Sequence, residues 1–156
     1  MSEARPLSAD NIRDLIVNRR ASFEFFIEDR FEAGLSLLGS EVKSLRAGRG
    51  NLQEAYVRLT DRGAVISGLH ISPYEQANRN NHEPLRERQL LLNPSEIAKL
   101  RKATREKGLT VVPLRLYLKG SWIKMEIAIA KGKKLHDKRH ALKERTAKQE
   151  LRRRGQ

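Results

Sequence analysis

The sequence predicts a mainly β protein, a small closed or nearly closed antiparallel β-barrel with one or two helices and a basic C-terminal tail. Several short β-rich stretches are separated by turn signals, without the strand–helix–strand alternation of a parallel sheet. The excess positive charge is concentrated near the C-terminus, where apolar residues are few. We therefore divide the chain into a polar N-terminal segment (1–17), a β-barrel (18–130) and a basic tail (131–156).

The expected strands are short. They span residues 23–27, 31–38, 55–59, 64–68, 88–92, 110–118 and 122–130. Turn residues 60–63 and 119–121 each predict a hairpin between the strands that they join. Residues 71–84 are rich in Asn and Pro and predict a long polar loop, whereas residues 10–17 form a short helix at most.

Alternation is clearest in the last strand. The residues expected to face the core are Ile123, Met125, Ile127 and Ile129, and those expected to face outward are Trp122, Lys124, Glu126 and Ala128.

Two helices are expected between the strands. Ser40 is placed to cap a short helix over residues 41–46, which Gly48 ends. The stronger signal is Asn93-Pro94-Ser95-Glu96, where Asn caps, Pro suits the first helical position and Glu completes a capping box. Gly108 ends this second helix.

The charge indicates a polyanionic partner. There are 32 Lys and Arg against 19 Asp and Glu, a net charge of +13, which favours nucleic acid first and an acidic membrane second. The absence of cysteine excludes disulfides, thiolate metal sites and a cysteine nucleophile. No apolar run is long enough to span a bilayer, and residues 1–11 lack a signal-peptide pattern, so we expect a cytoplasmic protein.

The tail carries more than half of the excess charge. Residues 131–156 hold 11 Lys and Arg against 3 Asp and Glu, or +8 of the total. We expect this segment to be disordered when free and helical on its polyanionic partner. His136 and His140 are spaced i, i+4, but without a neighbouring acidic cluster they favour a stacking or solvated role over a metal site.

Candidate catalytic groups are lacking, since no phosphate loop, metal cluster or acid–base pair stands out; we expect no enzyme activity, no cofactor and no metal. Binding signals are richer, because Arg115 and Lys124 fall on the outward faces of the last two strands, near Tyr117 and Trp122. Cations beside exposed aromatic rings suit RNA.

Long segments of the chain resemble the SmpB family (small protein B, the SsrA-binding protein). The matching segments are Phe31-Glu32-Ala33-Gly34-Leu35, residues 39–48, Ile71-Ser72-Pro73-Tyr74, residues 86–93 and residues 130–139. The resemblance covers almost everything from Asn18 to Arg139, and it implies the OB-like barrel and the basic tail.

The resemblance also implies a function, that of a non-enzymatic adaptor of trans-translation. Such an adaptor binds the tRNA-like domain of transfer-messenger RNA (tmRNA), delivers it to stalled 70S ribosomes, and allows nascent peptides to be tagged. Its tail enters the empty mRNA channel at the decoding region of the small subunit. The implied partners reached through the RNA are elongation factor Tu and alanyl-tRNA synthetase, and we expect a monomer with no membrane role.

The family's functional residues transfer by motif match. On the barrel, the resemblance implies RNA binding by Asn18, Arg19, Arg20, Glu32, Lys43, Arg46, Leu91 and Lys124. In the tail, it implies ribosome contacts by Lys131, Gly132, Lys133, Lys134, His136, Asp137, Lys138 and Arg139. The residues alone leave open a ribosomal or initiation-factor-like OB protein, an RNA-processing nuclease and a membrane-surface protein.

Overall fold

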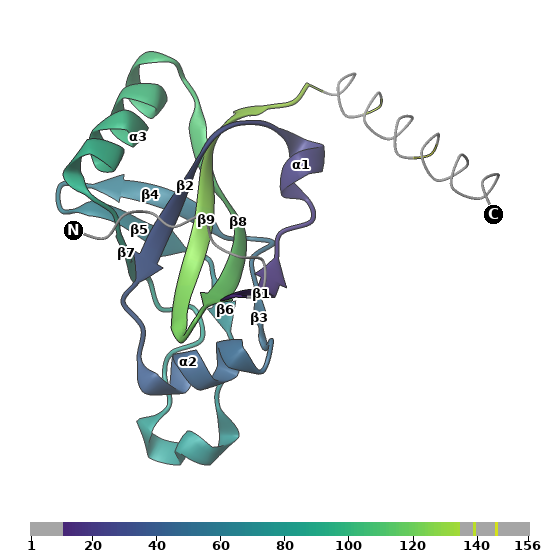
Figure 1. The fold of residues 1–156 in the computed structure, drawn as a ribbon, viewed down its shortest axis with the longest axis vertical. Coiled ribbons are helices and arrows are strands. Elements are labelled where there is room, and N and C mark those ends of the chain that lie inside the picture. The colour runs from purple at the N-terminus through teal and green to yellow at the C-terminus, as the bar shows by residue number, and fades with distance from the viewer. Residues whose placement is uncertain (1–10, 135–138, 140–145, 147–156) are drawn as a thin grey trace.

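The structure, a computed structural model, describes residues 11–134 together with Arg139 and Thr146. The seven strands of its main antiparallel sheet, in hydrogen-bonded order, are β1 (Ile12–Val17), β8 (Thr110–Lys119), β9 (Trp122–Gly132), β2 (Phe25–Leu35), β7 (Arg88–Leu91), β5 (Gly63–Ser67) and β4 (Tyr56–Thr60). A two-stranded ladder of β3 (Gly50–Asn51) and β6 (His70–Ile71) accompanies it. The mainly β, antiparallel class is confirmed (Figure 1).

The main sheet is open within the described residues, so the expected barrel does not close. Strands β1 and β4 form its two edges, and no ladder joins them within the described residues. β4 comes close to β8 as the sheet curls, yet the two strands are not paired through backbone hydrogen bonds.

Two predicted segments adopt different structures. Residues 12–17 form β1 and pair with β8, with Ile12 opposite Lys119, where a short helix was expected. The two strands expected at 23–27 and 31–38 are the single long strand β2, which carries an irregularity between Ile27 and Arg30. A bulge keeps one strand paired while it bends, which explains why the sequence looks interrupted there.

The described residues contain three α-helices, whereas one or two helices were expected. The additional one is α1 (Ala21–Glu24), a single turn ahead of β2. The others are α2 (Gly39–Arg46) and α3 (Pro94–Glu106), and a 3-10 helix, η2 (Glu75–Asn80), lies within the predicted polar loop.

The capping predictions have different outcomes. The Asn93 side chain accepts a hydrogen bond from the Glu96 backbone N–H at 3.0 Å, which confirms the start of α3. The cap predicted for α2 is wrong, because Ser40 lies inside that helix, where its hydroxyl bonds the buried His82 ring at 2.9 Å. Gly48 follows α2 with a φ of 73°, as a helix-ending glycine should.

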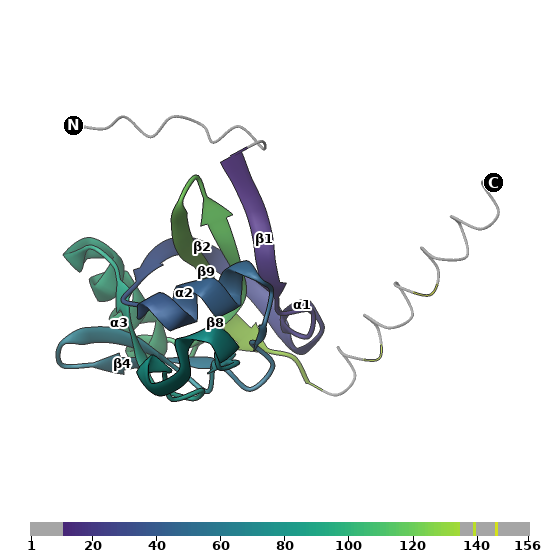
Figure 2. The same cartoon turned by 90° about the horizontal axis from the view of Figure 1, so that it is seen from below.

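The core lies between the curled sheet and the two longer helices. The four residues predicted to face it from β9 are buried, and α2 and α3 add Leu45 and Leu100. Ala128 is also buried, contrary to the expected alternation. In both Figure 1 and Figure 2, α1 lies beside the end of β9.

Candidate nucleic-acid interface

One side of the sheet, turned away from the core, carries three of the eight predicted barrel residues. We call it the outer sheet face, and the register of β8, β9, β2 and β7 defines it. Its members are Arg30, Glu32, Gly34, Leu91, Arg115, Tyr117, Lys119, Trp122, Lys124 and Glu126.

Three residues implied by the resemblance meet on this face. Lys124 on β9 lies opposite Gly34 on β2, and Gly34 in turn lies opposite Leu91 on β7. Glu32 lies two residues before Gly34 on the same strand, and therefore on the same side of the sheet. Segments that are far apart in the sequence thus place an acid, an apolar side chain and a cation next to one another.

The Leu91 side chain packs closely against Gly34. A Cβ atom at this position would lie 3.2 Å from the Leu91 Cβ, closer than ordinary side-chain contact. Glycine at this position therefore leaves room for the Leu91 side chain beside β2.

Glu32 is held by two neighbours on β8. Its carboxylate accepts hydrogen bonds from the Tyr117 hydroxyl and from Lys119 Nζ, the latter at 2.9 Å. Burial pushes the pKa of Glu32 upward, but the bonds from Tyr117 and Lys119, and the charges of Lys119 and Lys124, outweigh it and lower that pKa below its usual value. Glu32 therefore carries its negative charge at neutral pH and holds the side chains around it.

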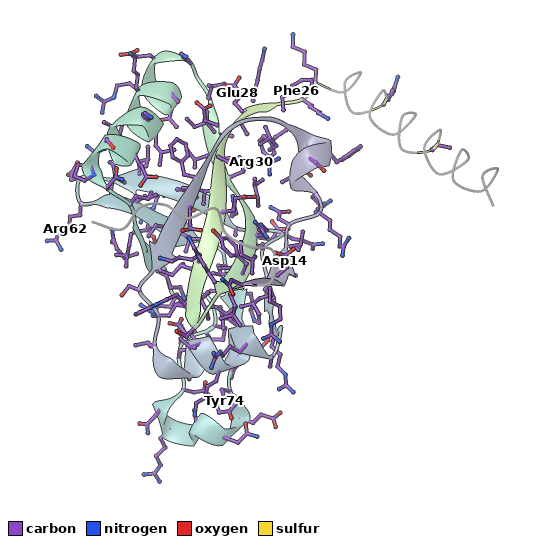
Figure 3. The ribbon with its side chains drawn as sticks, in the orientation of Figure 1. Asp14, Phe26, Glu28, Arg30, Arg62 and Tyr74 are labelled. Atoms are coloured by element: carbon purple, nitrogen blue, oxygen red, sulfur yellow. The ribbon has the colours of Figure 1, made fainter. Side chains whose placement is uncertain are left out.

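A chain of alternating charges runs beside Glu32. Arg115 bonds Asp14, and its Nε lies 3.6 Å from Glu126, which also pairs with Arg30 at 3.3 Å. Figure 3 labels Asp14 and Arg30, the two ends of this chain of charges. The Arg115 guanidinium also lies 4.4 Å from the centre of the Tyr117 ring.

The two aromatic residues of this face differ in access. Trp122 is 72% exposed at the β8–β9 hairpin, whereas Tyr117 is only 3% exposed beneath Arg115. The expectation of an exposed Tyr117 is therefore wrong, and Trp122 is the ring of this face that is open for stacking on a base.

Lys124 differs from the other cations of the face. Within the described part of the chain its side chain makes no hydrogen bond or ion pair, whereas Arg30, Arg115 and Lys119 are all paired with acids. Its ammonium group is thus the one on this face placed to meet a phosphate without first breaking a bond.

The segment Asn18-Arg19-Arg20 lies between β1 and α1. Asn18 Nδ2 donates to the Pro113 carbonyl at 2.9 Å, while Arg19 and Arg20 are exposed. Arg20 Nε lies 3.8 Å from Glu24, a loose surface pair. A groove beside this segment reaches the outer sheet face at Arg30 and Arg115.

Lys43 and Arg46 belong to a different part of the molecule. Both are exposed on α2, below the sheet in Figure 1, and Lys43 Nζ lies 5.4 Å from the centre of the Tyr74 ring. A groove between α2 and η2 lies next to Lys43 and Tyr74. The structure does not bring these two cations together with Lys124.

A buried ion pair fixes α2 beneath the sheet. Glu41 and Arg88 are both 0% exposed and 2.5 Å apart, and Arg86 reaches the second Glu41 oxygen at 2.6 Å. Arg88 also donates to the Leu69 carbonyl at 2.6 Å. Burial raises the pKa of Glu41, but its bonds to Arg86, the Leu38 N–H and Arg88 prevail and lower it.

The predicted tail residues are divided between the folded body and the region beyond it. Lys131 and Gly132 belong to β9 and pair with Phe26 and Phe25, and the Lys133 backbone N–H donates to the Glu24 carbonyl at 2.8 Å. Lys134 and Arg139 are exposed. Three further residues implied by the resemblance, His136, Asp137 and Lys138, lie outside the described residues, as do the expected changes in tail conformation.

The described residues include no group of three or more His, Cys, Asp or Glu side chains arranged to hold a metal ion. Nor do they include a helix that is both long and apolar enough to cross a membrane.

Comparison with known proteins agrees with the motifs. The family model described as "SmpB protein" matches residues 15–156. A relative from Deinococcus radiodurans, named SsrA-binding protein, is 52% identical over 141 residues, which cover 90% of this chain and 99% of the relative. The chain belongs to the SmpB family. Other SmpB-family relatives named SsrA-binding protein come from Synechococcus sp. (51% identical, covering 92% of this chain and 94% of the relative) and Bacillus cytotoxicus (51%, covering 86% of each).

A solved structure shows the same likeness in three dimensions. It is described as "tmRNA-SmpB: a journey to the center of the bacterial ribosome" and matches with a TM-score of 0.66 at 36% identity. The match covers 85% of this chain and 94% of the SmpB-family chain.

Proposed function

We propose that this protein is a non-enzymatic RNA-binding adaptor of trans-translation, which binds the tRNA-like domain of tmRNA and delivers it to stalled 70S ribosomes. The relatives' name, SsrA-binding protein, and the solved complex of tmRNA with an SmpB-family chain support this proposal. The net charge of +13 suits a protein that binds only polyanions.

The observation that carries the proposal is the meeting of Glu32, Leu91 and Lys124 on the outer sheet face. A folded RNA buries most of its base edges, so a protein recognises it largely by shape and through its backbone. Lys124 supplies an unpaired cation for a phosphate, and Trp122 supplies an exposed ring for an unpaired base. The bonds of Glu32 to Tyr117 and Lys119 keep this surface rigid.

We propose that the tail acts separately, by entering the mRNA channel of a ribosome that has lost its message. A channel occupied by mRNA leaves no room for the tail, so discrimination is steric. Because the tail folds only on binding, its affinity is lowered, but a flexible segment is able to probe whether the channel is empty. Because Lys131 and Gly132 lie in β9, the part that reaches the decoding region begins at about Lys134 and includes His136, Asp137, Lys138 and Arg139.

The remaining partners follow from the RNA. Alanyl-tRNA synthetase and elongation factor Tu meet the protein through that RNA, as the family resemblance implies. We propose a cytoplasmic monomer, because the binding face is complete within one chain.

Two measurements test this function. RNA that co-purifies with the tagged protein from cells should be enriched in tmRNA, and the purified protein should restore peptide tagging on stalled ribosomes in a reconstituted translation system lacking it. Stoichiometric recovery with every ribosome and no distinct RNA would instead favour a ribosomal or initiation-factor-like protein. RNA cleavage in the presence of a divalent metal would favour the nuclease.

A further inference from the structure

The base of the tail is fastened to α1 by one lysine. The Lys133 backbone N–H donates to the Glu24 carbonyl at 2.8 Å, and its Nζ donates to the Ser22 carbonyl at 3.0 Å. The same Nζ lies 5.0 Å from the centre of the Phe26 ring. Figure 3 shows Phe26 at the point where β9 leaves the sheet.

These contacts satisfy groups that α1 leaves open. The helix has only four residues, so its last carbonyls lack donors from a following turn. A lysine near a helix C-terminus donates to such carbonyls and is favoured by the helix dipole. The aromatic face beneath the ammonium group adds a cation–π contact.

The contacts also continue the ladder of β9 past its end. Gly132 pairs with Phe25 and Lys131 with Phe26, so Lys133 is the next residue held against the same neighbours. Its side chain bonds within the body, unlike the Lys131 side chain, which is exposed. The direction in which the chain leaves the sheet is therefore set at Lys133.

We propose that Lys133 is a positioning residue, which clamps the base of the tail onto α1 and Phe26 and so fixes the direction in which the tail leaves the folded body. Only the purpose of the clamp rests on the proposed function. That purpose is to aim the tail at the mRNA channel while the outer sheet face holds RNA. In this proposal the Lys133 ammonium group binds the Ser22 carbonyl and the Phe26 ring and does not contact the ribosome directly.

The clamp is tested first in the free, full-length protein. The chain has no native cysteine, so nitroxide labels introduced by Arg62→Cys and Arg139→Cys report one distance by pulsed electron paramagnetic resonance. Lys133→Met, which keeps the apolar stem, should broaden the distance distribution, as should Phe26→Leu. Lys133→Arg, which keeps a donor and a cation, should restore the distribution of the parent protein.

Lys131→Met is the matched control for this distance. It removes the same charge only two residues before Lys133, and the Lys131 side chain is exposed. Its distribution should match that of the parent protein. Equal widths for the parent, Lys133→Met and Phe26→Leu would overturn the clamp, as would broadening by Lys131→Met to the same degree.

The second test asks whether Lys133 acts through Phe26 in tagging. Lys133→Met and Phe26→Leu should each lower the rate of tagging on stalled ribosomes, and the double variant should be no worse than the poorer single variant. If the losses of the two single variants multiply in the double variant, or if Phe26→Leu tags at the full rate, Lys133 contacts the ribosome directly and the proposal is overturned. If the parent protein itself fails to tag, the proposed function falls, while the distance measurement still decides on the clamp.

Discussion

Lys124 owes its importance to what surrounds it on the outer sheet face. Its neighbours Arg115 and Lys119 are bound to acids, and Gly34 opposite it has no side chain to cover it. A cation that needs no rearrangement meets a phosphate at the lowest cost. The type of side chain does not distinguish Lys124 from Arg115 and Lys119. What distinguishes them is whether the cation is already paired with an acid.

Replacing Lys124 with Ala should weaken RNA binding and lower the slope of log K against log salt by about 0.7–0.9, since one phosphate contact is lost. Filter binding or fluorescence titration at several salt concentrations measures both effects. Lys102→Ala removes an exposed cation on α3, away from the outer sheet face, and should leave the slope unchanged. An unchanged slope for Lys124→Ala would remove this residue from the phosphate contacts.

Glu32 links protonation to folding. Its pKa is lowered in the folded protein by Tyr117 and Lys119 against the effect of burial, so the stability that it contributes is present above its ordinary pKa of 4.5 and is lost as the pH falls further. Glu32→Gln should make the free energy of unfolding less steeply dependent on pH below that value. Urea unfolding of both proteins over a series of acidic pH values gives the two slopes, and identical slopes would contradict the assignment.

At the scale of elements, α2 is held to the start of β7 by a charge pair that water does not reach. Glu41 and Arg88 are fully buried, and Arg88 also donates to the carbonyls of Leu69 and Pro84. Such a pair need not stabilise more than apolar residues would, but breaking it leaves one charge buried without a partner. The position of α2, and with it of Lys43 and Arg46, depends on both members.

Glu41→Gln should therefore lower the free energy of unfolding by about 3 kcal/mol, near the lower end of the cost of breaking buried pairs. Urea denaturation followed by circular dichroism measures the change. Glu87→Gln breaks the more exposed pair with Arg58 and serves as the control, with a much smaller expected effect. Similar losses in the two variants would show that burial does not set the cost.

At the scale of the whole molecule, the body ends later than charge and composition indicate. Strand β9 extends to Gly132, and Lys133 is bonded to α1. Two truncations separate body from tail. Removing residues 135–156 should leave the affinity of the outer sheet face for tmRNA and the thermal midpoint unchanged, while tagging is lost.

Removing residues 131–156 should in addition lower the thermal midpoint, because the pairs of Lys131 and Gly132 with β2 and the Lys133 bonds disappear. Differential scanning calorimetry and a tagging assay on both proteins decide the matter. A protein without residues 135–156 that still tags would refute the separate role of the tail.

Local patterns predicted the elements that depend on neighbours in sequence. The alternation of Ile123, Met125, Ile127 and Ile129, and the capping of α3 by Asn93, are confirmed because each depends on residues a few positions apart. Alternation also placed Lys124 on the outside. The bond of Glu32 to Tyr117 was not predictable, because it requires knowing that β2 and β8 flank β9.

The errors have the same origin. Residues 12–17 become a strand because β8 offers them an edge, and nothing within that segment indicates a partner about a hundred positions away. The joining of two expected strands into β2 likewise depends on β9, which pairs with both halves across the bulge. Tertiary partners override weak local preference in each case.

The pairing of β1 and β2 with β8 and β9 has a consequence for how the protein is made. The first two strands leave the ribosome early in synthesis, whereas their partners emerge only when most of the chain has been translated. Pairings so remote in sequence form slowly. A nascent copy interrupted before residue 132 therefore lacks the end of β9, and with it part of the ladder that holds β2 in the sheet.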